Sequence, residues 1–417
     1  MKKLLISTLI ALSFSTAASA VDQNKNINAH KDFRGEALVV EGQESWYREL
    51  RLDDWVSLGL PQADIDGVLE NVKGSGKLRD EANLDAPGFW TYEFSKQAEI
   101  VFDRALKHSF LVSSTKEAEK VANEFQKASV LWMIASYPNL HQANELAALD
   151  KSVTAYIKAA MMRGENVERV HMPLSDSVVY PTTITGLLHL PKGVEKAPVI
   201  LWTGGVDKTL VEHRSQFMEA LNKGFAVLTF DIPGAGLNTN IVMELGKEDQ
   251  AHQAALAYAK SDGRLDKKRI GALSSSGGGI PLMEFAFKQK ELKAVVARCA
   301  VVDGVLTKPF LFPKLPLMTA QSFGQRVGAD IHDLSSYGDI TIPLSLKTKG
   351  YFDGKPRMET PLLVINTSGD MVASPEDMKK TAALSSSSEI KFFGDDGHCP
   401  DGKAAEQAIV SFLTRNI

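Results

Sequence analysis

Hydrophobic residues in the N-terminal part of the chain recur every three or four positions, which is the spacing of amphipathic helices. In the clearest segment, Ser114 and Glu117 stand at the spacing of a capping box, and Pro138 breaks the pattern. Another helix is predicted over 144–162. Two earlier stretches, rich in aromatic residues that we assign to core packing, predict further helices: WYRELRLDDWVSLGL and FWTYEFSKQAEIVFDRALK. We therefore predict a helical domain over residues 44–165.

After about residue 166 the pattern changes to continuous apolar runs, and helical patterns separate most of the later ones. Apolar runs that alternate with helices are typical of buried parallel strands under right-handed crossovers. A short polar link joins the first two runs, which favours an antiparallel start. The eight predicted strands are VERVHMPL, TTITGLLHLP, APVILWTGG, FAVLTFDIPGAG, RIGALSSSGGG, LKAVVARCAVV, TPLLVINTSGD and SEIKFFGDD.

These strands predict a doubly wound α/β domain over residues 166–417. The alternation is interrupted at 305–354, a segment rich in proline, leucine, lysine and phenylalanine. We expect this segment to form a helical insertion over the carboxyl edge of the sheet.

The N-terminus has the order of residues of a secretory signal peptide. Lys2 and Lys3 precede a short apolar run, and small residues at Ala18 and Ala20 follow it. A buried N-terminal helix would need neither flank, and the run is too short to span a bilayer comfortably. We therefore predict a signal peptide over 1–20, cleaved after Ala20, and a periplasmic or secreted protein without a membrane span. Residues 21–43 are polar, and we expect them to be poorly ordered.

Composition narrows the function classes. The 417 residues are 44% hydrophobic and 24% charged, with a formal net charge of −4 and both signs spread along the chain. This is typical of a globular protein, and no basic stripe suggests a nucleic-acid partner.

The stretch GALSSSGGG (271–279) lies between a predicted strand and a predicted helix. It is either a flexible linker or a sharp turn that exposes a nucleophilic serine, and the flanking elements favour the turn. Such a turn needs small residues two positions before and after the nucleophile. Ser275 follows Leu273, which is bulky, and Ser274 lacks flanking glycines. Ser276, with Ser274 and Gly278 around it, fits best, although serine stands where the usual signature has glycine.

A nucleophilic serine needs a base and an orienting acid, and on this fold they follow in the order serine, acid, histidine. His398 lies on a loop after the last strand, whereas His332 lies inside the predicted insertion. Asp370 lies on the turn after the strand TPLLVIN, so we predict it as the acid. The rival carboxylates are Asp377, Asp395 and Asp396.

Backbone N–H groups are expected to stabilise the oxyanion, one from Gly277 and one from Gly205 or Val206 in the turn WTGGVDK. Other sites are weaker predictions. The triple glycine at a helix start has no following lysine, so it does not match a phosphate-binding P-loop. The polar residues around the histidine match no closed zinc or calcium pattern: Asp395, Asp396, His398, Cys399 and Asp401.

The chain has two cysteines, Cys299 and Cys399. Cys299 ends the predicted strand after the nucleophile's helix, and Cys399 follows His398, so both should lie on the active-site side of the sheet. A disulfide between them would fix the histidine loop. It requires Cα atoms within about 7 Å, which the sequence leaves open.

Taken together, residues 170–417 resemble an α/β-hydrolase, and the chain from residue 44 onward is similar to the FrsA-like (fermentation/respiration switch) esterases. The motifs that carry the likeness are SWYRELRLDDWVSLGL, GFWTYEFSKQAE, ASVLWMIASYPNL, VILWTGGVD, GALSSSGGG, INTSGD and GHCP. The resemblance implies that the helical domain is a cap, and that the activity is carboxylesterase-type, on small acyl esters, with no metal or organic cofactor. Members are usually thought of as cytosolic, and the predicted signal peptide departs from that.

The sequence thus predicts an exported serine hydrolase that cleaves a small-molecule ester through Ser276, Asp370 and His398. A carbon–carbon bond hydrolase, as implied by some relatives, or a peptidase would use the same residues. A catalytically inactive hydrolase fold that acts as a binding or regulatory protein is the alternative from another class.

Overall fold

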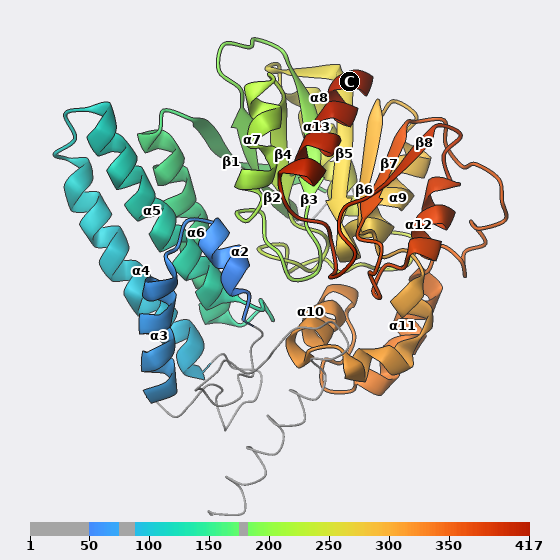
Figure 1. Cartoon of the computed structure of the whole chain (residues 1–417), viewed down its shortest axis with the longest axis horizontal. Helices are drawn as coiled ribbons and strands as arrows, with labels where there is room; N and C mark the ends of the chain where they lie inside the picture. Colours follow the sequence, from blue (N-terminus) through green and yellow to red (C-terminus); the bar gives the residue numbers. More distant parts are fainter. Residues whose placement is uncertain (1–49, 75–87, 175–181) are drawn as a thin grey trace, which may run out of the picture.

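The computed structural model describes residues 50–74, 88–174 and 182–417, and it places a central sheet between two layers of helices (Figure 1). The predicted signal peptide (1–20), the polar segment (21–43) and the start of the predicted helical domain (44–49) lie outside the described residues. No helix within the described ranges is long and apolar enough to cross a membrane.

The described strands form one eight-stranded sheet in the order β1-β2-β4-β3-β5-β6-β7-β8. Their bounds are β1 Asn166–Pro173, β2 Thr183–Leu190, β3 Ala197–Thr203, β4 Ala226–Phe230, β5 Leu265–Ser275, β6 Ala294–Arg298, β7 Leu362–Asn366 and β8 Ser388–Phe392. β2 is antiparallel to both of its neighbours, and every pairing from β4 to β8 is parallel. The predicted mostly parallel sheet with an antiparallel start is confirmed.

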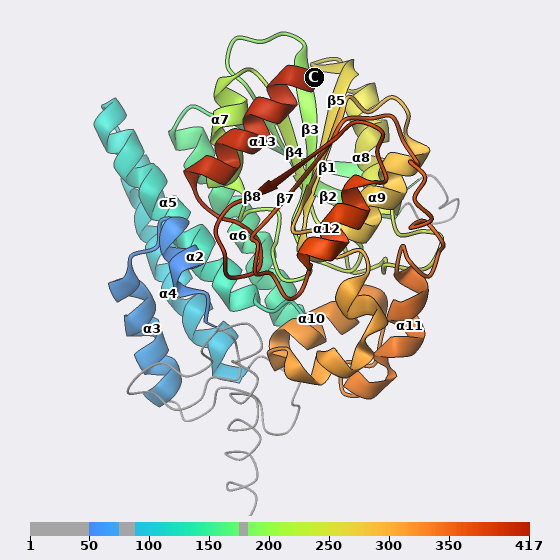
Figure 2. The ribbon, with the colours of Figure 1, turned by 45° about the vertical axis from the view of Figure 1, so that its right-hand side comes forward.

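Helices cover both faces of the sheet, which explains why β3, β4, β6 and β7 are buried at every residue. The helices of this part are α7 Arg214–Asn222, α8 Gln250–Ser261, α9 Gly279–Lys288, α12 Pro375–Ala382 and α13 Lys403–Asn416. Apolar side chains of α7 and α13 belong to one cluster, and those of α8, α9 and α12 belong to the larger one. Figure 2 shows these helices packed around the sheet. Apolar residues on both sides of a strand are the pattern from which the parallel sheet was predicted.

The N-terminal helical layer consists of α2 Leu52–Ser57, α3 Gln62–Gly74, α4 Gly88–Ser109, α5 Thr115–Ser136 and α6 Ala143–Met162. It has its own apolar cluster, which includes Trp55 and Trp90 and extends to Leu187 on β2. The side chain of Ser114 accepts a hydrogen bond from the Glu117 amide, as the capping pattern predicts. The Glu117 carboxylate accepts from the amide and the hydroxyl of Ser113.

The predicted insertion (residues 305–354) contains short helices: η3 Gly304–Thr307, η4 Pro309–Lys314, α10 Leu317–Val327, η5 Leu334–Ser336 and α11 Tyr337–Leu344. It follows β6 and lies below the sheet in both views, beside the N-terminal helical layer (Figures 1 and 2). Phe312 packs against Phe323 and Tyr337, which gives the insertion an aromatic centre that joins the main core.

Candidate active site

The turn after β5 carries Ser276 in a backbone conformation that non-glycine residues rarely adopt. β5 ends at Ser275, the short helix η2 (Ser276–Gly278) follows, and Ser276 has a φ of 51°. A Cβ added at Gly278 would lie 2.5 Å from the carbonyl oxygen of Gly204, and one at Gly279 would lie 2.8 Å from Cβ of Ala300. The turn is therefore sharp and strained, as a nucleophile elbow requires, and its glycines permit close backbone approach.

Ser274 occupies the position where the usual signature has glycine, and its side chain is fully buried. Its hydroxyl is hydrogen-bonded to that of Thr203 on β3 and lies 3.4 Å from Nε2 of His252. The hydroxyl group therefore turns away from the exposed side of the turn into a satisfied polar contact. This is why a serine is tolerated at the position.

The three residues predicted as a catalytic triad lie together. The Ser276 hydroxyl is 2.7 Å from Nε2 of His398, and Nδ1 of the same ring donates to Oδ2 of Asp370 over 2.7 Å. Ser276 comes from the end of β5, Asp370 from the turn after β7, and His398 from the loop after β8. We call that last segment, residues 394–402, the histidine loop.

The Asp370 carboxylate is buried and fully hydrogen-bonded. Oδ1 accepts from the amides of Val372 and Ala373, and Oδ2 accepts from His398 and from the side-chain amide of Asn366. Burial alone would raise the pKa of this carboxyl, but the hydrogen bond and charge of His398, followed by the other donors, hold that pKa below its ordinary value. Asp370 is therefore an anion that orients the imidazole.

The rival carboxylates have other surroundings. Asp377 is in the first turn of α12, with its side chain against Gly304, and burial raises its pKa with help from the charge of Asp303. Asp395 and Asp396 are exposed on the histidine loop. Within the described residues, the His398 ring is hydrogen-bonded to Asp370 and to none of these three carboxylates.

The loop after β3 (residues 204–208, the β3 loop) lies directly beside Ser276. A Cβ added at Gly205 would lie 2.9 Å from Cβ of Ser276, and one at Gly277 would lie 2.4 Å from Cγ1 of Val206. The three residues predicted to donate backbone N–H groups to an oxyanion, Gly205, Val206 and Gly277, thus surround the serine. The absence of side chains at the two glycines allows this approach.

Buried side chains support the β3 loop from below. Arg326 on α10 donates from Nε to the Val206 carbonyl oxygen over 2.9 Å. His213 lies under Gly204, where an added Cβ would be 2.9 Å from its Nε2. Burial, followed by the charge of Lys208, lowers the pKa of His213 to about 3, so the ring is neutral at ordinary pH.

A pocket of about 320 Å³ opens above Ser276. Its apolar wall comes from the segment after β6, the insertion and the turn after β7: Val301, Val305, Phe312, Leu315, Phe323 and Val372. Its polar wall comes from the N-terminal helical layer, the β3 loop and the end of β6, and includes Arg51, Asp54, Lys208 and Arg298. Ser276 therefore lies between an apolar and a polar side of the pocket.

Two ion pairs hold the start of the N-terminal helical layer over this pocket. Nη2 of Arg51 donates to Glu212 over 2.6 Å, and Lys208 on the β3 loop is 3.2 Å from Asp54. The Arg51 guanidinium also stacks over the Tyr137 ring at 4.7 Å. The polar wall is thus joined by ion pairs to the α/β part of the chain.

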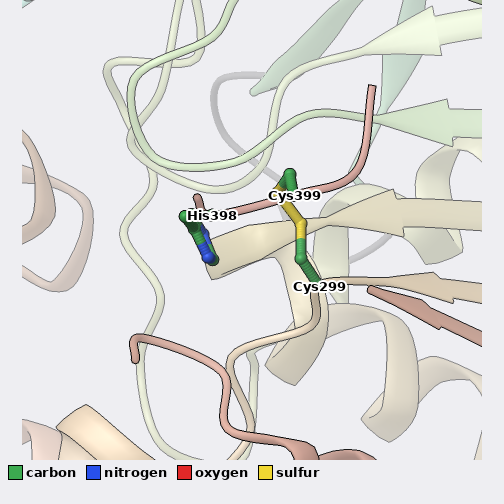
Figure 3. Close-up of side chains that lie close together, drawn as sticks. All are labelled: Cys299, His398 and Cys399. Carbon is green, nitrogen blue, oxygen red and sulfur yellow. A yellow bond between two sulfur atoms is a disulfide. The ribbon is translucent and has the colours of Figure 1, made fainter. Parts of the chain in front are cut away.

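A disulfide joins Cys299 to Cys399, and their Cα atoms are 4.9 Å apart, inside the limit of about 7 Å that a disulfide requires. Figure 3 shows the sulfur–sulfur bond next to the His398 ring. One ring nitrogen of His398 and the two sulfur atoms lie within 4.8 Å of one another. This group does not suit a metal ion, because the sulfurs are bonded to each other and both ring nitrogens are hydrogen-bonded.

Three supporting residues were not singled out from the sequence: Asn366, Arg298 and Arg326. The Asn366 amide donates to Asp370 and to the Ala373 carbonyl. Arg298 is buried at the end of β6 and donates to the Pro400 carbonyl of the histidine loop. A signal for Arg298 existed, because a charged residue that ends a continuous apolar strand must find a partner.

Proteins of similar sequence are hydrolases. The chain is 27% identical over 362 residues to Esterase FrsA of Vibrio cholerae serotype O1, with 84% of this chain and 83% of the relative covered. It is also 27% identical over 375 residues to Esterase FrsA of Photorhabdus laumondii, with 86% of each chain covered.

Solved structures share the fold at lower identity. The 2,6-dihydroxy-pseudo-oxynicotine hydrolase superposes with a TM-score of 0.67 at 17% identity, over 87% of this chain and 95% of that one. AbyA5 superposes with a TM-score of 0.60 at 17% identity, over 82% and 91%. The predicted α/β-hydrolase fold is thereby confirmed. The Esterase FrsA-like family model matches residues 7–394, nearly the whole chain, so this protein belongs to the FrsA-like esterase family and is a hydrolase.

Proposed function

We propose that this protein is an exported serine carboxylesterase that cleaves small acyl esters through an acyl-enzyme intermediate. His398, oriented by the Asp370 carboxylate, accepts the proton of Ser276 as its hydroxyl attacks the ester carbonyl. The tetrahedral oxyanion receives hydrogen bonds from the Gly277 amide and from the amide of Gly205 or Val206. His398 then gives the proton to the leaving alcohol, and a water molecule activated by the same ring releases the acyl group.

The observation that carries this proposal is the pair of 2.7 Å contacts made by one imidazole ring, to the Ser276 hydroxyl on one side and to the Asp370 carboxylate on the other. A serine hydroxyl is a poor nucleophile without such a base. The left-handed backbone at Ser276 adds support, because strain of this kind persists where function requires it. Relatives that are named as esterases favour an ester substrate.

The pocket supports a small substrate with one apolar part. Its volume of about 320 Å³ is at the lower end of ligand sites, which run from roughly 300 to 1,000 Å³. The apolar wall, which includes Phe312 and Phe323, would take a short hydrocarbon chain, and the polar wall would face the other half of the ester. The insertion and the N-terminal helical layer, which we propose acts as a cap, enclose the site and disfavour polymeric substrates.

The assay follows turnover of p-nitrophenyl acetate, butyrate and octanoate, with butyryl p-nitroanilide as the matching amide. We expect ester turnover that falls at octanoate, and amide turnover well below that of the butyrate ester. Faster cleavage of the amide would instead favour a peptidase.

Variants assign the nucleophile. Ser276→Ala is expected to lose several orders of magnitude in kcat, because residues of a triad act as a unit. Ser274→Ala is the matched control, and it should keep turnover within about tenfold of the wild type, since the Ser274 hydroxyl bonds to Thr203 and not to His398. Wild-type turnover in Ser276→Ala would reject the proposed mechanism.

Export is tested separately. The basic residues Lys2 and Lys3, the apolar run and the small residues before Val21 support a signal peptide. Expression of the full chain in a Gram-negative host should therefore yield a periplasmic protein whose N-terminal residue is Val21. An intact Met1 in the cytoplasmic fraction would contradict the proposed export.

A further inference from the structure

The histidine loop lacks regular secondary structure and has little buried surface. Its residues 394–397 are exposed, His398 and Cys399 are half-buried, and Pro400 is buried. Gly394, Gly397 and Gly402 all have positive φ angles. A loop of this composition has many accessible conformations, so the position of the His398 ring depends on what fastens the loop.

On the side before His398, hydrogen bonds fasten the loop to the residues that follow β7. The Thr367 hydroxyl donates to the Gly397 carbonyl over 2.6 Å, and the Ser368 amide donates to the Gly394 carbonyl over 3.1 Å. On the side after His398, the loop is fastened to the end of β6. Cys399 is bonded to Cys299, and the Arg298 guanidinium donates to the Pro400 carbonyl.

The end of β6 is a suitable anchor because it is tied to the other two members of the triad. β6 lies between β5, which leads to Ser276, and β7, which leads to Asp370. The Cys299 amide donates to the Ile365 carbonyl on β7, and the Val301 amide donates to the Ser276 carbonyl. The disulfide from Cys299 to Cys399, the neighbour of His398, therefore fixes the position of His398 relative to Ser276 and Asp370.

We propose that the Cys299–Cys399 disulfide, with Arg298, positions His398 as the general base, so that full activity requires the oxidised protein. The expected loss of activity on reduction rests on the proposed function, whereas the positioning of His398 by the disulfide does not. Cys299 and Cys399 are positioning residues, since they act through His398. A small dithiol or phosphine that reduces this disulfide should therefore lower the activity.

Backbone strain indicates how the loop would respond. Cys299 has a φ of 45° and Cys399 a φ of 71°, and both lie in the left-handed region that favours glycine. Strained residues persist only when their surroundings hold them. Once the bond is broken, Cys399 is free to leave this conformation, and His398, the adjacent residue, moves with it.

The redox step is balanced by an external reductant. A dithiol passes two electrons and two protons to the disulfide, which becomes two thiols, while the dithiol closes to its own cyclic disulfide. A phosphine supplies the two electrons instead: it takes the oxygen atom of a water molecule and becomes a phosphine oxide, and the two protons of that water go to the thiols. Cys299 is fully buried and Cys399 is half-buried, so attack is expected at the Cys399 sulfur. Figure 3 shows this sulfur on the side of the bond nearer the loop.

The experiment compares the oxidised protein with the same folded protein after reduction by a phosphine. The chain has only two cysteines, so a reductant acts on no other disulfide. We expect kcat on p-nitrophenyl butyrate to fall about 10- to 100-fold while KM changes little, because a displacement of about 1 Å in a catalytic group costs up to that much. Reoxidation should restore the rate. Cys399→Ser should match the reduced wild type and be insensitive to the reductant.

A second readout does not depend on activity. The proton shared by Nδ1 of His398 and Asp370 is expected as a downfield NMR resonance that is absent in His398→Ala. It should be sharp in the oxidised protein and broadened or lost after reduction. If the oxidised protein shows this resonance but no turnover, the proposed function fails. The change of the resonance on reduction then tests by itself whether the disulfide positions His398. Full kcat and an unchanged resonance in protein with two titratable thiols would overturn the proposal.

Discussion

Replacing Arg326 by methionine is expected to weaken both the fold and the oxyanion site, because this side chain joins three parts of the molecule. Arg326 comes from α10 in the insertion and is only 1% exposed. It donates to the carbonyl of Val206 in the β3 loop over 2.9 Å. It also donates to the carbonyls of Asn139 and Pro138 in the N-terminal helical layer, over 2.7 and 3.1 Å.

The expected loss of stability follows from the buried carbonyls that lose their hydrogen-bond donor in Arg326→Met. Within the described residues, the Val206 and Asn139 carbonyls have no other donor, whereas Pro138 keeps a 3.3 Å contact with the Ser322 hydroxyl. A buried acceptor without a partner costs about 1–3 kcal/mol, so two of them cost about 2–6 kcal/mol. Methionine also removes a buried charge, which offsets part of this cost. We expect a net loss of about 2–4 kcal/mol in the free energy of unfolding.

The kinetic effect is expected through the β3 loop. Loss of one complete oxyanion donor costs roughly 10²- to 10³-fold in kcat, so a loosened Val206 should cost about 10- to 100-fold. Arg326→Lys should lie between the wild type and Arg326→Met in both stability and kcat. A lysine has fewer donors to share among the three carbonyls. Burial also disfavours a cation at this position, since it lowers the pKa of the native guanidinium to about 10.

The assay measures urea unfolding, kcat and KM on p-nitrophenyl butyrate, and the inhibition constant of an alkyl boronic acid, whose adduct resembles the tetrahedral intermediate. Arg104→Met is the control, since Arg104 is half exposed and pairs with Glu124 on the surface. Weaker boronate binding in Arg326→Met, with KM nearly unchanged, is the expected signature. Wild-type kcat and boronate affinity in a destabilised Arg326→Met would show that the arginine holds the fold but not the oxyanion site.

Further predictions concern the elbow and two buried carboxyls. Gly278→Ala should lose most activity and several degrees in Tm, because its Cβ would meet the Gly204 carbonyl at 2.5 Å; a wild-type Tm would refute this packing. Asp370 has a lowered pKa, so its stabilising effect is present above the ordinary value of 3.8 and is lost as pH falls through the native value. The free energy of unfolding, measured with urea, should therefore depend less on pH below pH 4 in Asp370→Asn than in the wild type. Equal pH dependence in the two proteins would contradict the lowered pKa of Asp370. Burial raises the pKa of Asp231 to about 8 against the charge of Arg326, so stability is lost as pH rises from about 4 to about 8. Asp231→Asn should remove this loss, so its free energy of unfolding should rise relative to that of the wild type between pH 5 and pH 9. A difference in stability that stays constant over this range would contradict the raised pKa of Asp231.

The sequence was sufficient for the parts of the site that are encoded locally. The register of Ser276 followed from the size of its neighbours, and the positions of Asp370 and His398 followed from strand ends and chain order. Ser274, the departure from the usual signature, is explained only in three dimensions, because its partner Thr203 lies 71 residues away. Local patterns predict elements and turns, but they do not specify which turns meet.

Long-range polar support was therefore beyond the sequence. Arg326 and Val206 are 120 residues apart, and Arg298 and Pro400 are 102 residues apart, with no motif that links either pair. The helix α3 was also missed, although Ile65, Val68 and Val72 have helical spacing and are buried in the structure. In that case the signal was present and was masked by the aromatic-rich stretches on both sides.

Labelling of the mature protein with a fluorophosphonate tests directly whether Ser276 is an activated nucleophile. Trypsin should cut after Arg269 and Lys288, so all three serines of the elbow fall in one peptide, and its fragment spectrum must separate them. We expect a single adduct on Ser276 that is absent in Ser276→Ala. A folded wild-type protein without an adduct, or with the adduct on Ser274, would contradict it.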